Sequence, residues 1–399
     1  MNITKKMKVP RGFSFGIAEA AIKKPGRPDL ALIYSREDSV AAGVFTTNKV
    51  KGAPVKLDIE RIRSGRARAI VVNSGNANVC TGRKGMMDAK EMARIAALEL
   101  GIDEEAVYVA STGVIGTPMP MERIRPKIAS MAGALNSGFF EDVARAIMTT
   151  DTFPKYAARS FKLGGREVRI AAVAKGSGMI HPNMATMLCF IITDIRAEKA
   201  VLDRALKDSV GKSFNRITVD GDTSTSDTVL LMANGQAGNP PLVRSSGEYA
   251  LFCRQLDAVT MELARMVAKD GEGATKLIEV HVKNAKTKKD ALRGAFTIAE
   301  SPLVKTAFFG NDANWGRIMA ALGRSGISIE EEKVDIYMGK IKIVGKGQAR
   351  GKDTEAGTLL RENREISLVV DLNLGRESEK VLTCDLTDEY VRINAEYRT

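Results

Sequence analysis

The sequence predicts an α+β fold in which mostly antiparallel β-sheet is flanked by helices, and three observations favour it. Short apolar segments of strand type cluster together, as in residues 13–55 and 334–393. Amphipathic helical stretches are also grouped, instead of alternating regularly with single strands. Gly164 and Gly165 separate two strand-type segments, and a two-residue turn joins only antiparallel strands. A layered architecture is therefore favoured over a doubly wound parallel sheet.

The strands and helices of the first half can be read in order along the chain. A helix is predicted after Asp88, because Asp88 and Glu91 have the spacing of a capping box, apolar residues recur at helical spacing, and Gly101 ends the pattern. The predicted strands are 30–34, 40–45, 67–72, 106–110 and 168–174, with a second helix at 141–148. Turn-rich loops are expected at 73–78 and 111–116, where strands end.

The second half repeats these kinds of element without repeating the sequence. The predicted helices are 197–213, 249–268, 302–309 and 315–322, and a strand is predicted at 278–282. Residues 334–393 are expected to be mostly strands joined by charged hairpins. Polar loops are expected at 219–228 and 270–273.

The composition is that of an ordinary globular protein. The chain has 399 residues, 44% of them apolar and 27% charged, which is enough for two domains or one large layered domain. A net charge of +12 would suit a nucleic-acid-binding protein, but the basic residues are spread along the whole chain. The aromatic residues are not interleaved with them in any known nucleic-acid-binding pattern. We predict a basic enzyme that binds no nucleic acid and could take an anionic ligand.

The cysteines and the N-terminus indicate a cytoplasmic protein. The four cysteines are Cys80, Cys189, Cys253 and Cys384. They lie far apart without a Cys-x-x-Cys pair, so neither a zinc site nor a redox motif is suggested. We expect them to be buried thiols in a reducing compartment. The basic N-terminus is not followed by an apolar core of signal-peptide length, and no run is long enough to span a membrane.

The most informative stretch is 175–194. Gly176, Gly178 and Pro182 make its first half a loop, and the apolar run 187–192 makes its second half a buried strand. Thr186 lies at the junction, where a hydroxyl can be held rigidly beside an open loop. This position suits a nucleophile, although a threonine at a strand edge more often only satisfies local hydrogen bonds.

Several other chemistries are excluded by the residues present. With only His181 and His281, a multi-histidine metal site is impossible; His281 alternates within a strand, and His181 is best explained as shaping its loop. Residues 211–213 look like the end of a Walker A motif, but Leu206 occupies the required glycine position and the segment is helical. No Gly-x-Gly-x-x-Gly follows a strand, so no nucleotide cofactor is predicted.

A nucleophile that carries its own base remains possible. If Thr186 were a chain terminus, its α-amine, with a reference pKa of roughly 7.7 to 8.0, could take the hydroxyl proton. Acyl transfer also needs donors for a developing oxyanion. Residues 111–113 could supply a hydroxyl and a backbone N–H at a glycine, although a plain strand-to-loop turn explains the same residues.

The stretches 175–179 and 181–188 closely resemble the signature of the ornithine acetyltransferase family, also called glutamate N-acetyltransferase, of arginine biosynthesis. Further segments of the chain match the same family: 43–48, 73–78, 112–113, the run from Thr149, 221–227, 310–315 and the C-terminus. The resemblance implies self-cleavage between Ala185 and Thr186 into pieces 1–185 and 186–399, which together form two stacked β-sheets between helical layers.

The resemblance also implies the reaction. Acetyl would pass from N2-acetyl-L-ornithine to L-glutamate by a ping-pong route through acetyl-Thr186, with no cofactor, in a heterotetramer of two copies of each piece. Some members of the family also take acetyl from acetyl-CoA, and the sequence leaves that second activity open. The rival enzyme is a self-cleaving amidase or aminopeptidase of related fold, which would pass the acyl group to water.

The resemblance finally implies the residues of the site. Thr112 and Gly113 would form the oxyanion hole. Lys175 would bind the substrate carboxylate, and Glu272 would bind a substrate amino group. Each side chain carries the charge opposite to that of the group it would bind. The remaining implied substrate ligands are Thr149, Thr186, Asn394 and Thr399, with Thr150 and Thr152 as alternatives to Thr149.

Overall fold

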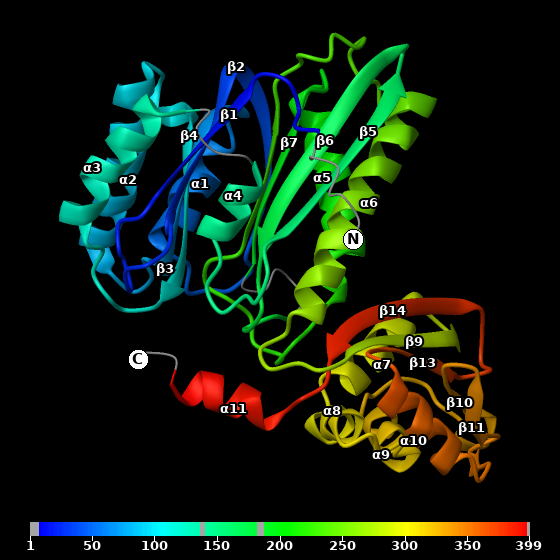
Figure 1. The fold of residues 1–399 in the computed structure, drawn as a ribbon. Helices are drawn as coiled ribbons and strands as arrows, with labels where there is room; N and C mark the ends of the chain where they lie inside the picture. The colour runs from blue at the N-terminus through cyan, green and yellow to red at the C-terminus, as the bar shows by residue number, and fades with distance from the viewer. Residues whose placement is uncertain (1–7, 136–139, 182–186, 397–399) are drawn as a thin grey trace. The chain divides into compact units, whose positions relative to one another are not determined.

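Two β-sheets organise the chain, one in each of two units (Figure 1). The computed structural model describes residues 8–135, 140–181 and 187–396. The first unit is formed by Met1–Met179, Asn183–Asn215 and Asp222–Val267, and the second by Ile180–Pro182, Arg216–Gly221 and Ala268–Thr399. Each unit therefore draws on residues from both sides of the predicted cleavage point.

The sheet of the first unit has the strand order β4-β3-β2-β8-β7-β6-β5, with β1 also paired to β2. Its strands are β1 Phe13–Ala18, β2 Leu30–Phe45, β3 Arg66–Asn76, β4 Val107–Val114, β5 Lys155–Leu163, β6 Arg166–Lys175, β7 Leu188–Thr193 and β8 Thr228–Ala233. Only the β3–β4 and β7–β8 pairs are parallel. Strands β6 and β7, which precede and follow the predicted cleavage point, are antiparallel neighbours in this sheet.

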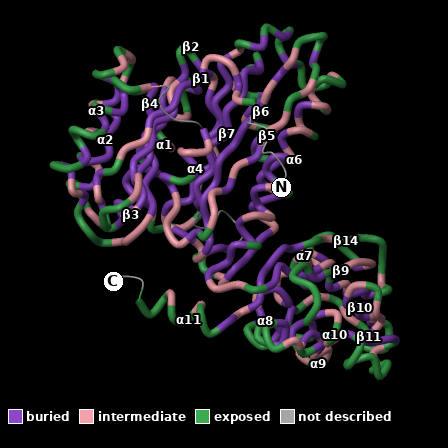
Figure 2. The backbone as a smooth tube through the Cα atoms, viewed as in Figure 1, coloured by how far each residue is buried: buried purple, intermediate pink, exposed green. Residues whose placement is uncertain are grey.

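Alternating side chains of this sheet enter different hydrophobic clusters. In β3, Ile70 and Val72 pack in one cluster with Phe140, whereas Val71 packs in another with Met92. Successive side chains of a strand point to opposite faces, so the sheet buries apolar side chains on both. The helices assigned to this part of the chain are α1 Ala53–Arg61, α2 Gly82–Leu100, α3 Met121–Gly133, α4 Phe140–Ala146, α5 Lys199–Lys212 and α6 Gly247–Lys269. Figure 2 shows the strands mostly buried and the helices exposed along their outer sides.

The second unit contains a six-stranded sheet in the order β12-β11-β10-β13-β9-β14, in which only β13 and β9 are parallel. Its strands are β9 Leu277–Ala285, β10 Asp335–Met338, β11 Ile341–Gly345, β12 Gln348–Ala349, β13 Glu365–Asp371 and β14 Glu377–Cys384. Its helices are α7 Lys288–Ala299, α8 Pro302–Phe309, α9 Trp315–Gly323, α10 Asp353–Glu362 and α11 Asp388–Ala395. A single apolar cluster joins the sheet to α7, α8, α9 and α10.

The predicted α+β class, with two mostly antiparallel sheets flanked by helices, is confirmed. So is the hairpin, in which Leu163 pairs with Arg166 across Gly164 and Gly165. Both glycines have positive φ, 55° and 77°, as a type I′ turn requires. The predicted strand after Thr186 is β7, and every residue of it is buried.

Other predictions were wrong in detail. Helix α2 begins at Gly82, so Asp88 lies inside the helix and does not cap it. The Asp88 Oδ1 accepts a hydrogen bond of 2.8 Å from Lys84 Nζ in the same helix. The helix does end at Gly101, whose φ is 63°. The two short strands at 30–34 and 40–45 are one strand, β2, whose pairing with β3 is irregular between Tyr34 and Ser39.

The remaining corrections concern loops, helices and thiols. Part of the loop expected at 73–78 belongs to β3, which continues to Asn76. Residues 334–393 contain helix α10 and most of α11 besides strands. Only Ala356 and Leu360 of α10 are buried, which is too sparse a pattern to predict that helix. The four cysteines are not all buried, because Cys80 is exposed and Cys253 is half-buried. None of the described helices has both the length and the apolar composition for crossing a membrane.

Candidate active site

Three of the predicted site residues, Ala185, Thr186 and Thr399, lie outside the described residues. The others divide between the units. Thr112, Gly113, Thr149 and Lys175 belong to the first, and Glu272 and Asn394 belong to the second.

In the first unit, the ends of two strands bring Lys175 and Thr112 together. Lys175 is the last residue of β6, Thr112 lies near the end of β4, and the Lys175 Nζ donates to Thr112 Oγ1 at 3.1 Å. Both residues are buried, at 2% and 1% exposure. Lys175 pairs in the sheet with Leu188, two positions after Thr186 in the sequence. An ammonium group and a hydroxyl therefore meet beside the start of β7, the strand that follows the predicted nucleophile in the sequence.

Gly113 lies where only glycine fits. Its φ is +133°, and a Cβ placed on it would lie 2.3 Å from the carbonyl carbon of Gly75 and 2.6 Å from the nitrogen of Asn76. The β3–β4 pairing becomes irregular at this point. The close approach of another chain segment, which the sequence suggested for an oxyanion hole, is therefore present at Gly113.

Asp151 links the predicted ligand Thr149 to the end of β6. Its Oδ2 accepts from the Thr149 N–H at 2.9 Å, and its Oδ1 accepts from the Gly176 N–H at 2.7 Å and from Lys155 Nζ at 2.7 Å. The side chains of Asp151 and Lys155 are both completely buried. Burial opposes ionisation of Asp151, but Lys155 and then Lys175 outweigh it and lower its pKa to about 2.

Sequence reasoning missed this ion pair. Neither Asp151 nor Lys155 was singled out from the sequence, because polar residues after a helix are usually solvated. Their spacing of four offered a weak signal, since charged residues are almost never fully buried unless they are paired.

A second buried carboxyl group, Asp227, directly precedes β8 and contacts Met187, the residue before β7. Its Oδ1 accepts from the N–H of Met187 at 2.9 Å, and Met187 O accepts from the Thr228 N–H at 3.1 Å. Burial raises the pKa of Asp227 well above its usual range, although Met187 and Lys175 act in the opposite direction. Asp227 belongs to the 221–227 segment that matches the family, but nothing in its local sequence distinguishes it from the other polar residues of that segment.

In the second unit, Glu272 and Asn394 are brought together. Asn394 Nδ2, in α11, donates to Glu272 Oε2 at 2.8 Å. The Thr387 hydroxyl at the start of α11 donates to Gly273 O at 2.8 Å. Gly273 has φ +68°, and a Cβ on it would lie 2.7 Å from the backbone nitrogen of Tyr390. The helix and the loop that carry these two predicted ligands are therefore fastened directly to each other.

The residues just before the undescribed segment are held in the second unit. Ile180 N donates to Asp220 Oδ1 at 2.9 Å, and Ile180 O accepts from Val219 N at 2.8 Å. His181 Nε2 lies 2.9 Å from Glu300 Oε1. The other histidine, His281, lies on β9, where burial and then Lys380 lower its pKa.

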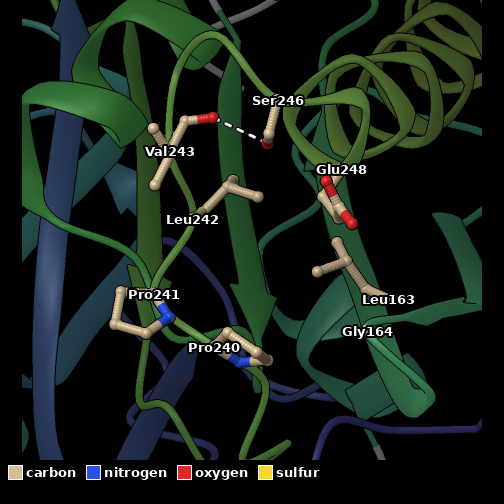
Figure 3. Close-up of a pocket in the computed structure, with 8 residues that line it drawn as sticks. All are labelled: Leu163, Gly164, Pro240, Pro241, Leu242, Val243, Ser246 and Glu248. Atoms are coloured by element: carbon tan, nitrogen blue, oxygen red, sulfur yellow. Dashed lines mark hydrogen bonds between the residues drawn. The ribbon is translucent and has the colours of Figure 1, made fainter.

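A cavity in the first unit lies apart from all the predicted site residues. It measures about 210 Å³ and is lined by the hairpin residues Leu163 and Gly164, the Pro240–Val243 segment, and the start of α6 (Figure 3). No predicted ligand lines it, so it carries no part of the candidate site. Among the described residues, no group of three or more His, Cys, Asp or Glu side chains is placed to hold a metal ion.

Comparison with known proteins identifies the family of this chain. A model of the ArgJ family matches residues 14–399, which include every described residue of the candidate site. The chain belongs to the ArgJ family. Among curated ArgJ proteins, the "Arginine biosynthesis bifunctional protein ArgJ" of Geobacter sulfurreducens is 53% identical over 390 residues, covering 98% of this chain and 99% of that protein. The protein of the same name from Caldanaerobacter subterraneus is 50% identical over 398 residues, covering 99% of this chain and 98% of that protein.

A solved ArgJ structure from Bacillus halodurans, also called arginine biosynthesis bifunctional protein, is 43% identical with a TM-score of 0.50. It covers 52% of this chain but 97% of its own. The solved ArgJ chain is therefore only about half as long as the present one.

Proposed function

We propose that this ArgJ-family chain is an acetyltransferase of arginine biosynthesis that moves acetyl from N2-acetyl-L-ornithine to L-glutamate. The observation that carries the proposal is the buried contact of Lys175 with Thr112 at the ends of β6 and β4. It brings a cation suited to an α-carboxylate within 3.1 Å of a hydroxyl suited to a developing oxyanion. Two close relatives named as arginine-biosynthetic proteins support the same pathway.

The proposed nucleophile is Thr186, freed by self-cleavage after Ala185. Its α-amine would take the hydroxyl proton, the hydroxyl oxygen would attack the acetyl carbonyl of the donor, and ornithine would leave. Glutamate would then take the acetyl group from acetyl-Thr186. The half-length solved chain from Bacillus halodurans supports a cut near the middle.

The other residues have roles that follow from charge. Thr112 and the backbone of Gly113 would stabilise the oxyanion, with one such donor worth roughly 3 to 4 kcal/mol of barrier. Lys175 would bind the carboxylate, and Glu272, oriented by Asn394, would bind an amino group. Thr149 and Thr399 would complete the substrate site.

We also propose that acetyl-CoA is a second acetyl donor, because the relatives are called bifunctional. The first activity requires no cofactor, since only the acetyl group is carried covalently. The mature enzyme would contain two copies of each piece. Turnover of glutamate with acetyl-CoA as the sole donor would establish the second activity, and its absence would leave the enzyme with the first alone.

The deciding experiment is an intact-mass spectrum of the purified protein under denaturing conditions, followed by product analysis. Sharing 43.1 kDa in proportion to 185 and 214 residues predicts pieces of roughly 20 and 23 kDa. Thr186 should be the new N-terminus, and acetylglutamate the product. An uncut chain that still transfers acetyl would contradict the terminal-amine mechanism, and free acetate as the main product would indicate an amidase.

A further inference from the structure

Glu272 lies in a loop that leaves the sheet of the second unit beside the end of β14. Strands β9 and β14 are antiparallel neighbours, and their pairing reaches Leu277 and Cys384 (Figure 1). Residues 270–276 lead directly into β9, and residues 385–387 lead from β14 into α11. The loop of Glu272 and the segment that begins α11 therefore run side by side.

Asp385 binds this loop through both of its carboxyl oxygens. Its Oδ1 accepts from the N–H groups of Thr275 at 2.8 Å and Lys276 at 2.9 Å, and its Oδ2 accepts from the Thr275 hydroxyl at 2.5 Å. The Asp385 side chain is almost fully buried, and hydrogen bonds to a carboxylate are stronger than those between neutral groups. Thr275 follows Glu272 by three positions, so Asp385 fixes the loop close to that carboxylate.

The two glycines that flank Glu272 pack against the same segment. A Cβ on Gly271 would lie 2.5 Å from Cys384 Sγ, and a Cβ on Gly273 would lie 2.8 Å from Thr387 Oγ1. Glycine permits such a close approach because it has no side chain. The backbone on either side of Glu272 therefore rests on the segment that contains Asp385.

A buried lysine holds that segment in place. Lys305 of α8 is only 3% exposed, and its Nζ donates to Thr383 Oγ1 at 3.0 Å and to the carbonyl oxygen of Cys384. The Lys305 carbonyl accepts from the Leu386 N–H at 3.4 Å. A buried ammonium group is costly unless it is hydrogen-bonded, so these bonds favour one arrangement of the chain. Residues on both sides of Asp385 are thus anchored to α8.

We propose that Asp385 is a positioning residue for recognition of the substrate's amino group, an assignment that rests on the proposed function. Asp385 acts through Glu272, whose Oε2 also accepts from Asn394 Nδ2 at 2.8 Å. By fixing the loop, Asp385 holds the Glu272 carboxylate where it binds the side-chain amino group of N2-acetyl-L-ornithine. A displacement of about 1 Å in such a group can cost on the order of a hundredfold in rate.

The test compares two ligands in the mature enzyme. One is N2-acetyl-L-ornithine, for which KM is measured, and the other is N2-acetyl-L-norvaline, which lacks only the side-chain amino group and is measured as a competitor. Asp385→Ala should raise KM for the first by about tenfold or more and change the inhibition constant of the second by less than about threefold. Asp385→Asn keeps an oxygen for the two N–H groups, so its KM should lie between those of wild type and Asp385→Ala.

Asp371→Ala is the matched control. Asp371 is also buried in the second unit, but it lies near the other end of β9, where its Oδ1 accepts from Asn284 Nδ2 at 2.8 Å. It should leave both constants within about threefold of wild type. Equal losses for the two ligands in Asp385→Ala, or an equal effect of Asp371→Ala, would overturn the proposal, because either result indicates a general structural role.

Glu272→Gln separates this proposal from the function on which it rests. If Glu272→Gln leaves KM for N2-acetyl-L-ornithine unchanged, the proposed role of Glu272 fails and that of Asp385 fails with it. If Glu272→Gln raises this KM and Asp385→Ala does not, the role of Asp385 alone is removed.

A further measurement needs no variant to fold. If Asp385 anchors the loop, the N–H groups of Thr275 and Lys276 should exchange with solvent about as slowly as those within β9 in the wild-type protein. Exchange as fast as at the exposed residues 351–352 would show that the loop is not held by Asp385 and would overturn the proposal.

Discussion

Replacing Asp151 by asparagine should destabilise the first unit through the lysine that it leaves behind. Asp151 Oδ1 and Lys155 Nζ are 2.7 Å apart with both side chains fully buried. At an effective dielectric constant of about 20, two unit charges at that distance attract by about 6 kcal/mol, and burial of both groups offsets part of this. Removing one partner of a buried pair typically costs about 3 to 5 kcal/mol, because the other charge stays buried and unpaired. For a unit of this size, that corresponds to a fall in Tm on the order of 6 to 20 °C.

The fall in Tm can be measured by differential scanning calorimetry of Asp151→Asn, Lys155→Met and the double variant. The double variant removes both charges and should recover at least half of the loss in Tm. The control is Glu262→Gln, which breaks an ion pair to Arg159 of similar length, 2.6 Å, whose side chains are more than a third exposed. It should cost about 1 kcal/mol or less.

The stability difference should also depend on pH in a defined direction. The pKa of Asp151 is lowered to about 2 in the folded protein, so its contribution is present above the ordinary aspartate value of about 3.9 and is lost as pH falls towards 2. The gap between wild type and Asp151→Asn should therefore narrow below pH 4. A fall in Tm under about 2 °C for Asp151→Asn, or a double variant as unstable as the single one, would refute this reasoning.

Three further predictions concern the site. Gly113→Ala should reduce kcat by about 10²-fold or more, because a Cβ at this position would lie 2.3 Å from the backbone of Gly75. The control is Gly133→Ala, whose Cβ meets nothing within 4 Å and which should leave kcat unchanged. Equal kcat values for the two variants would contradict the assignment of Gly113 to the oxyanion hole. Asn394→Ala should raise KM for the acetylated donor about tenfold, because the substitution removes one hydrogen bond to Glu272. The intact mass of this variant should still show cleavage. An unchanged KM would argue against a role for the contact between Asn394 and Glu272 in substrate binding. His181→Gln should undergo self-cleavage at a rate within about threefold of wild type, because His181 lies against Glu300 in the structure. A hundredfold lower rate would indicate that His181 acts as the base for cleavage.

The sequence was sufficient wherever the signal was local. Two adjacent glycines between strand-type segments specified the 163–166 hairpin, and the apolar run after Thr186 specified β7. Gly101 marked the end of α2 correctly, because a residue in the left-handed conformation is the usual helix end. The beginning of the same helix was misplaced, since the spacing of Asp88 and Glu91 imitates a capping box inside a helix.

The sequence also predicted Thr112, Lys175, Glu272 and Asn394, through a family pattern. The contacts between Lys175 and Thr112 and between Asn394 and Glu272 emerged only from the structure, across 63 and 122 residues of chain.

Tertiary structure alone decided which charged residues are buried. Asp151, Lys155 and Asp227 look like solvated loop residues in sequence, yet each is buried in the first unit. Their environments are made by chain segments far away along the sequence, such as Gly176 for Asp151 and Met187 for Asp227. Periodicity and turn preferences report on neighbours within a few residues, whereas the burial of a charge and its pKa depend on what the folded chain packs around it.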